Sequence, residues 1–210
     1  MCEGVEDASF LRELIGRCNL GHFDVRPARD IGGIGGISGF REGLTTAVGH
    51  SGFRRISRMA LVADCDTHHR ETMRSICEQI SEANQQRNVA GRFAIPHRAY
   101  EATGGHPRLT VILLPGPNAR GALETLLWKA ITNLQAHRRI AQCIETACVG
   151  AGITRWPQSK ADKARVHAAL AFMNRDNPAI GLGRLWSRYP DLIPVTHKAF
   201  DDIETALRAL

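Results

Sequence analysis

The sequence predicts an α/β protein in which a parallel sheet is flanked by helices and the last third of the chain is helical. Two short, almost continuous apolar runs, at residues 58–63 and 109–114, are typical of parallel strands that are buried on both faces. Segments with the 3.6-residue periodicity of amphipathic helices lie before and after these runs. The alternation of the two patterns over the first two-thirds of the chain is typical of repeated β–α units with a parallel sheet.

The expected elements follow one another with a clear start or stop signal for most of them. In the first half we expect, in order, a helix over residues 6–17, a short strand around Phe23 and Val25, a glycine-rich turn over 31–39, a weak helix ending at Val48, the strand at 58–63 and a helix over 70–85. In the second half we expect the strand at 109–114, ended by Pro115-Gly116-Pro117, and helices over 119–133, 136–149, 161–173 and 198–209. Residues 1–135 are therefore expected to form the α/β core, and residues 136–210 a helical extension packed on the same domain.

The composition is that of an ordinary globular domain with an excess of positive charge. Of the 210 residues, 43% are hydrophobic and 23% are charged, which excludes a disordered chain. The formal net charge is +6, and arginines outnumber lysines by 23 to 4. Since guanidinium groups pair well with phosphates, we expect nucleic acid as a partner. Codon usage in a GC-rich genome would give the same arginine excess, and this explanation stays open.

Several function classes are excluded by what the sequence lacks. No run approaches the ~18 apolar residues needed to span a bilayer, and the first residues lack the apolar segment of a signal peptide. We therefore expect a cytoplasmic protein without a membrane partner. The six cysteines do not have the spacing of a zinc site, and no motif of a serine or cysteine acyl-transfer enzyme is present.

Two segments without helix or strand periodicity are candidate functional loops. The glycine-rich residues 31–39 fail the G-x-G-x-x-G pattern in every register and lack a P-loop lysine, so we expect a structural turn there. Residues 83–108 contain four arginines and a single acid, Glu101. This composition is typical either of a basic loop near a binding groove or of a solvated connection.

The most informative residues are acids at the end of an expected strand. Asp64 and Asp66 follow the apolar run 58–63, and residues two apart in an extended chain point the same way. Ligand sites collect at the carboxyl ends of parallel strands, and carboxylates are preferred ligands of Mg²⁺ and Mn²⁺. The pair is therefore a candidate metal site. The alternative is that Asp66 only caps the helix that follows.

Two further groups of polar residues lie close to expected helix starts. Glu3 precedes the first expected helix, and Asp7 lies in its first turn. The helix dipole favours acids in the first turn, which explains Asp7. It explains Glu3 less well, because a glycine separates Glu3 from the helix. His68 and His69 come directly after the aspartate pair. Because adjacent helical residues diverge by ~100°, we expect these two histidines to form an exposed helix start rather than a metal site.

Five sequence pieces occur in order along nearly the whole chain. They are E-G-x-x-D at residues 3–7, D-x-D at 64–66, L-L-P-x-x-N-x-x-G-x-L-E at 113–124, S-K-A-D-K-A at 159–164 and T-H-K-A-F at 196–200. In this order they resemble the TOPRIM domain, the metal-binding α/β module of topoisomerases, primases and OLD (overcoming lysogenization defect) nucleases. They are most similar to an uncharacterised group of bacterial TOPRIM-like proteins related to the OLD nucleases. The resemblance implies a TOPRIM-like parallel sheet.

The resemblance also implies a role for each acid. Glu3 matches the TOPRIM glutamate that acts as general base or metal ligand, and Asp7 matches the second acid of the same motif. Asp64 and Asp66 match the metal-binding pair. Glu124 is similar to the later acid that completes a second metal position in OLD-type sites.

The activity that the resemblance implies is a Mg²⁺- or Mn²⁺-dependent nuclease of DNA or RNA, acting in phage defence with a separate ATPase. Lys163, with Lys160 as the alternate, resembles the basic residue that such enzymes place on the scissile phosphate. The alternative is a non-catalytic TOPRIM-like module that docks on an ATPase through its helical last third, and a second copy of the chain is a further candidate partner. Only Met1 and Cys2 precede Glu3, where the family has a strand, so we expect a shortened first strand or an upstream extension of the reading frame.

Overall fold

Two parallel strands form the centre of the fold. In the computed structural model, which describes residues 1–66, 68–86 and 93–210, strand β1 (Arg58–Asp64) pairs with strand β2 (Arg108–Leu114). The register runs from Arg58 opposite Arg108 to Asp64 opposite Leu114. The two strands lie at the predicted apolar runs and are parallel as predicted. The larger sheet expected from repeated β–α units is wrong for the described residues, in which the sheet has two strands and the fold is mixed α/β but mostly helical.

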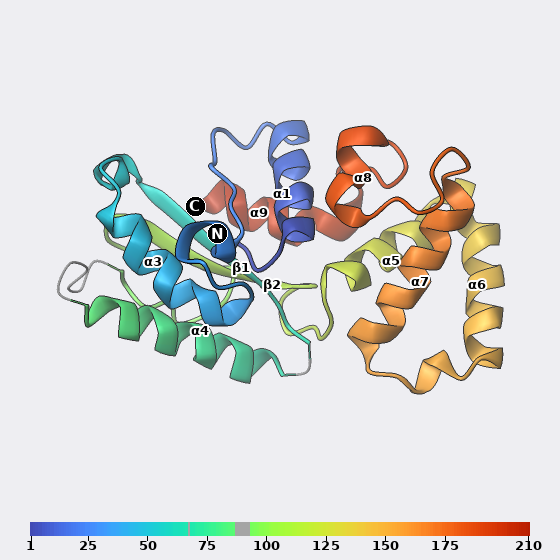
Figure 1. Cartoon of the computed structure of the whole chain (residues 1–210), viewed down its shortest axis with the longest axis horizontal. Helices are drawn as coiled ribbons and strands as arrows, with labels where there is room; N and C mark the ends of the chain where they lie inside the picture. The colour runs from blue at the N-terminus through green and yellow to red at the C-terminus, as the bar shows by residue number, and fades with distance from the viewer. Residues whose placement is uncertain (67, 87–92) are drawn as a thin grey trace.

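Helices surround the two strands and form most of the second half of the chain. They are α1 (Val5–Arg17), α2 (Ala28–Gly32), α3 (Phe40–Gly49), α4 (His69–Asn84), α5 (Leu123–Asn133), α6 (Arg138–Gly150), α7 (Gln158–Met173), α8 (Leu182–Arg188) and α9 (Asp201–Ala209). Figure 1 shows α3 and α4 on one side of the strands, α1 and α9 on the other, and α5, α6 and α7 beyond the carboxyl ends of the strands.

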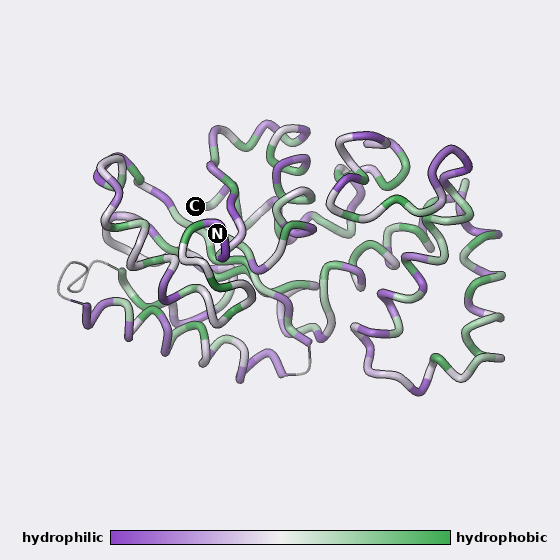
Figure 2. The backbone as a smooth tube through the Cα atoms, in the orientation of Figure 1, coloured by the Kyte–Doolittle hydropathy of each residue, from purple (hydrophilic) through white to green (hydrophobic). Residues whose placement is uncertain are grey.

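The alternation of side chains along β1 decides which helices pack on each face of the sheet. Ala60 and Val62 belong to the hydrophobic cluster that includes residues of α1 and of α5 to α9. Leu61 and Ala63 belong to a second cluster, with residues of α3 and α4. Because side chains two apart point to the same face, Asp64 is on the α1 and α5 side. Figure 2 shows the hydrophobic colour along both strands, whereas α4 alternates between hydrophilic and hydrophobic stretches.

A single residue near the amino end extends the pairing of β1. Cys2 forms isolated parallel bridges with Val62 on one side and with Pro27 on the other. The backbone N–H of Cys2 donates to the carbonyl of Arg26 at 3.0 Å, and the N–H of Val62 donates to the carbonyl of Met1 at 2.9 Å. The strand predicted around Phe23 and Val25 is wrong, because extended pairing in this segment occurs at Pro27 instead. This pairing fixes Glu3 directly beside the end of β1.

Helix α5 begins four residues later than predicted. Asn118 has a φ of 59° and Gly121 a φ of 130°, and neither conformation is compatible with a helix. The N–H of Gly121 donates instead to the carbonyl of Cys65 at 2.8 Å, which ties the loop after β2 to the end of β1. Helix α8 was not predicted from the sequence. The helix predicted over 198–209 begins as a 3₁₀ turn at residues 198–200, and α9 follows it.

The glycine-rich segment is a structural turn, as predicted. Gly33 and Gly36 have φ values of 80° and 70°, which side chains with a Cβ rarely adopt. A Cβ on Gly32 would lie 2.7 Å from the backbone nitrogen of Gly43, so the close approach of α2 to α3 also requires glycine.

The helical last third packs on the same core as the sheet. Its apolar residues belong to the cluster that also contains Val62 and Leu114. Helix α7 packs against α5 and α6 and contains a buried ion pair, in which Arg165 Nη1 lies 3.0 Å from Asp162 Oδ1. The division at residue 135 stays a prediction. No helix in the described ranges is long and apolar enough to cross a membrane.

Candidate functional site

Asp64 lies where three segments of the chain meet. Its backbone N–H donates to Glu3 Oε1 at 2.9 Å, and its Oδ1 accepts a hydrogen bond from the backbone N–H of Leu123 at 3.0 Å. Asp64 is the last residue of β1, Glu3 follows the bridge at Cys2, and Leu123 begins α5. The two hydrogen bonds therefore hold the segment before α1 and the start of α5 against the end of the strand.

Two more acids lie in the first turns of the helices that start here. Asp7 is buried in the first turn of α1, where its Oδ2 accepts a hydrogen bond from the backbone N–H of Gly4 at 2.9 Å. Glu124 is buried in the first turn of α5. The expected helix-start role of Asp7 is thus present, but burial and the nearby charge of Glu124 raise its pKa. Glu3, Asp7, Asp64 and Glu124 together are termed the acid cluster below.

The pKa values of three of these carboxyls are raised because the acids are buried next to one another. Burial, followed by the charges of Asp7, Glu3 and Glu124, raises the pKa of Asp64 to about 9. Burial raises the pKa of Glu3 to about 7, against the lowering effect of its hydrogen bond from Asp64. The pKa of Asp7 rises to about 6, again chiefly through burial. Glu3, Asp7 and Asp64 therefore retain protons at a pH at which exposed carboxyls are ionised.

A lysine faces the acid cluster from α7. Of the two candidate lysines, Lys163 is the one whose Nζ lies 3.7 Å from Glu124 Oε1, and its side chain is 64% exposed. The charge of Lys163 also offsets part of the rise that burial causes in the pKa of Asp7. Lys160 is exposed on the same helix. The amine of Lys163 therefore lies at the border between the buried acids and the solvent.

Asp66 differs from the other predicted acids because it is exposed. The alternative that it caps α4 is wrong, since the residue before this helix is His68 and no side chain caps it. The charge of Asp66 nevertheless adds to the rise that burial causes in the pKa of Glu3, so its carboxylate lies within electrostatic reach of the acid cluster. A ligand shared by Asp64 and Asp66 stays a prediction.

The donor groups of the acid cluster suit a hard divalent cation. Mg²⁺ and Mn²⁺ prefer carboxylate oxygens, and a cation between buried carboxylates would relieve the repulsion that raises their pKa values. Glu3, Asp7 and Asp64 each use one oxygen for a backbone hydrogen bond, which leaves the other for a ligand. Over residues 1–66, 68–86 and 93–210, however, no group of three or more His, Cys, Asp or Glu side chains is arranged so that it could hold a metal ion.

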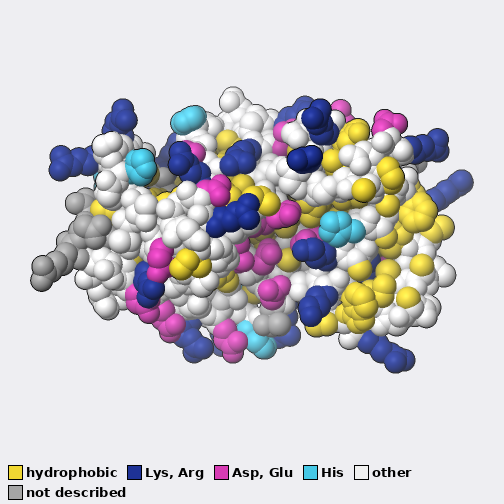
Figure 3. Space-filling model, in the orientation of Figure 1, with side chains coloured by type: hydrophobic (Ala, Val, Ile, Leu, Met, Phe, Trp, Pro, Cys, Tyr) yellow, Lys and Arg dark blue, Asp and Glu magenta, His cyan; other side chains and the backbone are white. Residues whose placement is uncertain are grey.

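Basic side chains that the sequence analysis did not single out lie near the acids. Arg120 is exposed in the loop before α5, and its charge opposes the rise that burial causes in the pKa of Cys65, between Asp64 and Asp66. His68 is exposed as predicted, but His69 is half-buried and lines a cavity with Arg70. The signal that could have found these residues is their position directly after the two strands. In Figure 3, acidic side chains gather at the centre of the molecule, with lysines and arginines around them.

Comparison with known proteins gives a family. Residues 1–209 match the family described as "Protein of unknown function (DUF3226)". No curated protein and no solved structure shows significant similarity to the chain.

Proposed function

Since the chain belongs to the DUF3226 family, whose description states no activity, we propose from the acid cluster that the protein is a divalent-cation-dependent nuclease that hydrolyses phosphodiester bonds of DNA or RNA. The observation that carries this proposal is that Glu3, Asp7, Asp64 and Glu124 lie at the carboxyl end of β1, with Asp7 and Glu124 buried and Glu3 and Asp64 half-buried, and that the charges of the other three raise the pKa of Asp64. Burying like charges together destabilises a fold, and binding of a cation at these acids would compensate for it.

The residues of the site suit the chemistry of phosphodiester hydrolysis. A Mg²⁺ or Mn²⁺ ion held by Asp64, Glu3 and the neighbouring carboxylates would supply Lewis-acid stabilisation of the negative phosphate. As a general base, Glu3 would accept the proton of the attacking water. The water oxygen bonds to phosphorus while the bond to the leaving oxygen breaks, and that oxygen takes a proton from solvent. Lys163 offsets charge on the phosphate oxygens.

A TOPRIM-like arrangement is part of the same proposal. Two observations support it. Cys2 pairs in parallel with Val62, as β1 does with β2, and an acid directly follows each of Cys2 and Ala63. By analogy with the OLD nucleases, the protein would act in the cytoplasm, in phage defence, with a separate ATPase as its partner. A second copy of the chain is a further candidate partner.

The nuclease proposal is tested with the purified chain and end-labelled oligonucleotides. Single- and double-stranded DNA and RNA are incubated with Mg²⁺, Mn²⁺ or EDTA. We expect cleavage that requires the cation and is lost in the Asp64→Ala/Asp66→Ala variant. Asp176→Ala, which removes an exposed acid from the loop after α7, is the matched control and should cleave normally. Absence of cation-dependent cleavage of all four substrates would contradict the proposal.

The role of Lys163 is tested separately from cation binding. We expect Lys163→Met to lower the cleavage rate by about 10²-fold, as loss of a group that stabilises transition-state charge does, while Mn²⁺ binding is retained. Lys160→Met, on the same exposed face of α7, is the matched control. Equal effects of the two substitutions would show that the contact of Lys163 with Glu124 has no part in the reaction.

The alternative, a non-catalytic module that docks on an ATPase, has one observation in its favour. Val149, Trp156 and Phe172, in or next to the helices of the last third, are large apolar residues that are 51–68% exposed. Such residues are typical of contact surfaces. Titration with Mn²⁺ in a calorimeter separates the two functions, since a module without catalysis needs no cation at the acid cluster. Failure of Asp64→Asn to weaken Mn²⁺ binding would favour the module.

A further inference from the structure

A basic cavity lies on the other side of the sheet from the acid cluster. Its volume is about 600 Å³, and one wall is the first half of α4, from His69 to Cys77. The opposite wall consists of residues 97–100, which run along β2, and of Pro117 and Asn118 in the loop that follows it. The N–H of Tyr100 donates to the carbonyl of Val111 at 2.7 Å, which holds this wall against the strand.

The cavity is lined by positive charge. Arg70, Arg74 and Arg98 line it together with two histidines, and no Asp or Glu is among the described lining residues. Arg74 and Arg98 lie 3.9 Å and 3.7 Å from Glu78 and Glu101, and all four side chains are more than half exposed. Such exposed ion pairs contribute little, so these guanidinium groups can change partner when an anion arrives. Within the described residues, no carboxylate lies within 4.0 Å of Arg70.

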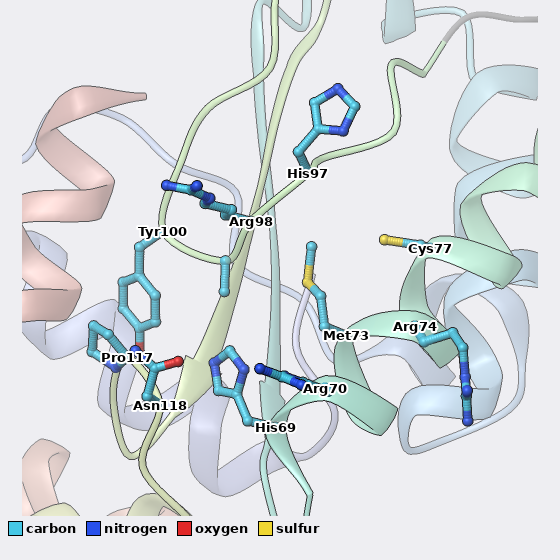
Figure 4. Close-up of a pocket in the computed structure, with 11 residues that line it drawn as sticks. His69, Arg70, Met73, Arg74, Cys77, His97, Arg98, Tyr100, Pro117 and Asn118 are labelled. Atoms are coloured by element: carbon cyan, nitrogen blue, oxygen red, sulfur yellow. The ribbon is translucent and has the colours of Figure 1, made fainter.

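At one end of the cavity lies a buried polar atom that lacks a hydrogen-bond partner. The Nε2 atom of His69 is buried and has no hydrogen-bond partner, although buried polar atoms normally have one. Asn118 is exposed at the same end, on a residue with a φ of 59°. Figure 4 shows His69, Arg70 and Asn118 projecting from the two walls at this end. An imidazole, an amide and a guanidinium are side-chain groups that can bind phosphate oxygens.

The loop between β2 and α5 lines the cavity at one end and adjoins the acid cluster at the other. Its first residues, Pro117 and Asn118, line the cavity, whereas Gly121 bonds to Cys65, and Leu123 at the start of α5 bonds to Asp64. Asp66 and His69 are three residues apart, so their Cα atoms are separated by at most about 10 Å. Because a nucleic-acid strand carries a phosphate on every nucleotide, a strand that reaches Asp66 also brings a neighbouring phosphate close to His69.

We propose that the basic cavity binds a phosphate group of the nucleic-acid strand, next to the bond that is cleaved at the acid cluster. This inference rests on the proposed nuclease function for the identity of the strand. The backbone phosphates of DNA and RNA offer the same chemistry to Arg70, Arg98 and His69. The cavity contacts the strand backbone and holds it in register without reading the bases.

Binding is tested without cleavage, by fluorescence anisotropy of labelled single-stranded DNA and RNA in EDTA at several salt concentrations. For single strands, each phosphate contact contributes about 0.7 to the slope of log K against log salt. Because the cavity is proposed to bind one phosphate, we expect Arg70→Ala/Arg98→Ala to reduce the slope by about 0.7 and to weaken binding at least tenfold at low salt. Arg138→Ala/Arg139→Ala, exposed at the start of α6, is the matched control and should keep the slope of the unmodified protein.

The outcomes separate the cavity from the nuclease proposal. An unchanged slope in the Arg70→Ala/Arg98→Ala variant overturns the cavity proposal, even if the protein cleaves DNA. A reduced slope supports it, even if no cation produces cleavage, in which case only the nuclease proposal fails. Inorganic phosphate is titrated as a second probe. Phosphate binding that depends on Arg70 and Arg98, together with strand binding that does not, would overturn the assignment of the cavity to a strand.

Discussion

Replacing Asp64 by asparagine should stabilise the protein, and the gain should grow with pH. The asparagine side chain would keep the shape of the aspartate and the acceptor for the N–H of Leu123, while removing the ionisable carboxyl. In the folded protein the pKa of Asp64 is about 9, because of burial and the charges of Asp7, Glu3 and Glu124, whereas its ordinary value is 3.8. The folded state therefore binds more protons than the unfolded state, and its stability falls as pH rises between these two values.

The size of the effect follows from proton linkage. A group that is protonated when folded and ionised when unfolded lowers the free energy of unfolding by about 1.4 kcal/mol per pH unit. Between pH 5 and 7 this gives about 3 kcal/mol for one full proton. Asp64 is only half-buried and shares proton uptake with its neighbours, so solvent and coupling reduce the figure to about 1–3 kcal/mol.

The assay is urea unfolding of both proteins in EDTA, at pH 5 and at pH 7. We expect Asp64→Asn to be more stable than the unmodified protein at both pH values, by about 1–3 kcal/mol more at pH 7 than at pH 5. For the exposed Asp176→Asn variant, the stability difference from the unmodified protein should be the same at pH 5 and pH 7. A stability difference between Asp64→Asn and the unmodified protein that is the same at both pH values would refute the argument that the buried acids hold a proton at Asp64.

Two further predictions concern residues that fix the position of the site. Phe10 is fully buried, with its ring centroid 5.5 Å from that of Trp186 and 5.0 Å from that of Phe200; Phe10→Ala should lower the free energy of unfolding by about 3–5 kcal/mol, and Phe10→Leu by clearly less. Equal losses in the two variants would contradict the argument that the buried apolar volume of Phe10 stabilises the fold. A Cβ on Gly121, which has a φ of 130°, would overlap Thr125, so Gly121→Ala should cost about 1–3 kcal/mol in urea unfolding. Gly104→Ala, where the added Cβ meets nothing within 4 Å, is its control, and a comparable loss there would rule out this explanation.

Local sequence patterns predicted those elements in which buried and exposed residues alternate regularly or form a continuous buried run. The apolar runs at β1 and β2 and the amphipathic periodicity of α1 and α4 were confirmed, because burial on one or two faces imposes a regular spacing of apolar residues. The strand around Phe23 and Val25 was wrong because alternation over three residues is a weak signal. The residue of this segment that pairs is Pro27, and its partner is Cys2, which is distant in sequence. Residues 83–108, for which a basic loop and a solvated connection were both left open, lie partly outside the described residues, at Arg87 and Arg92, while Arg98 lines the basic cavity.

The sequence by itself determined that acids stand at the end of a buried strand and at the starts of two helices, since strand burial and helix starts are local properties. It could not determine that Glu3, Asp7, Asp64 and Glu124 lie together at the end of β1, because that depends on hydrogen bonds between segments that are far apart in the chain. The tertiary structure alone decided that Asp64 faces the acids whereas Asp66 is exposed. It also placed Lys163 beside Glu124 and formed a basic cavity on the opposite side of the sheet. The physical reason is that charge and burial act through space, and folding sets the distances between these residues.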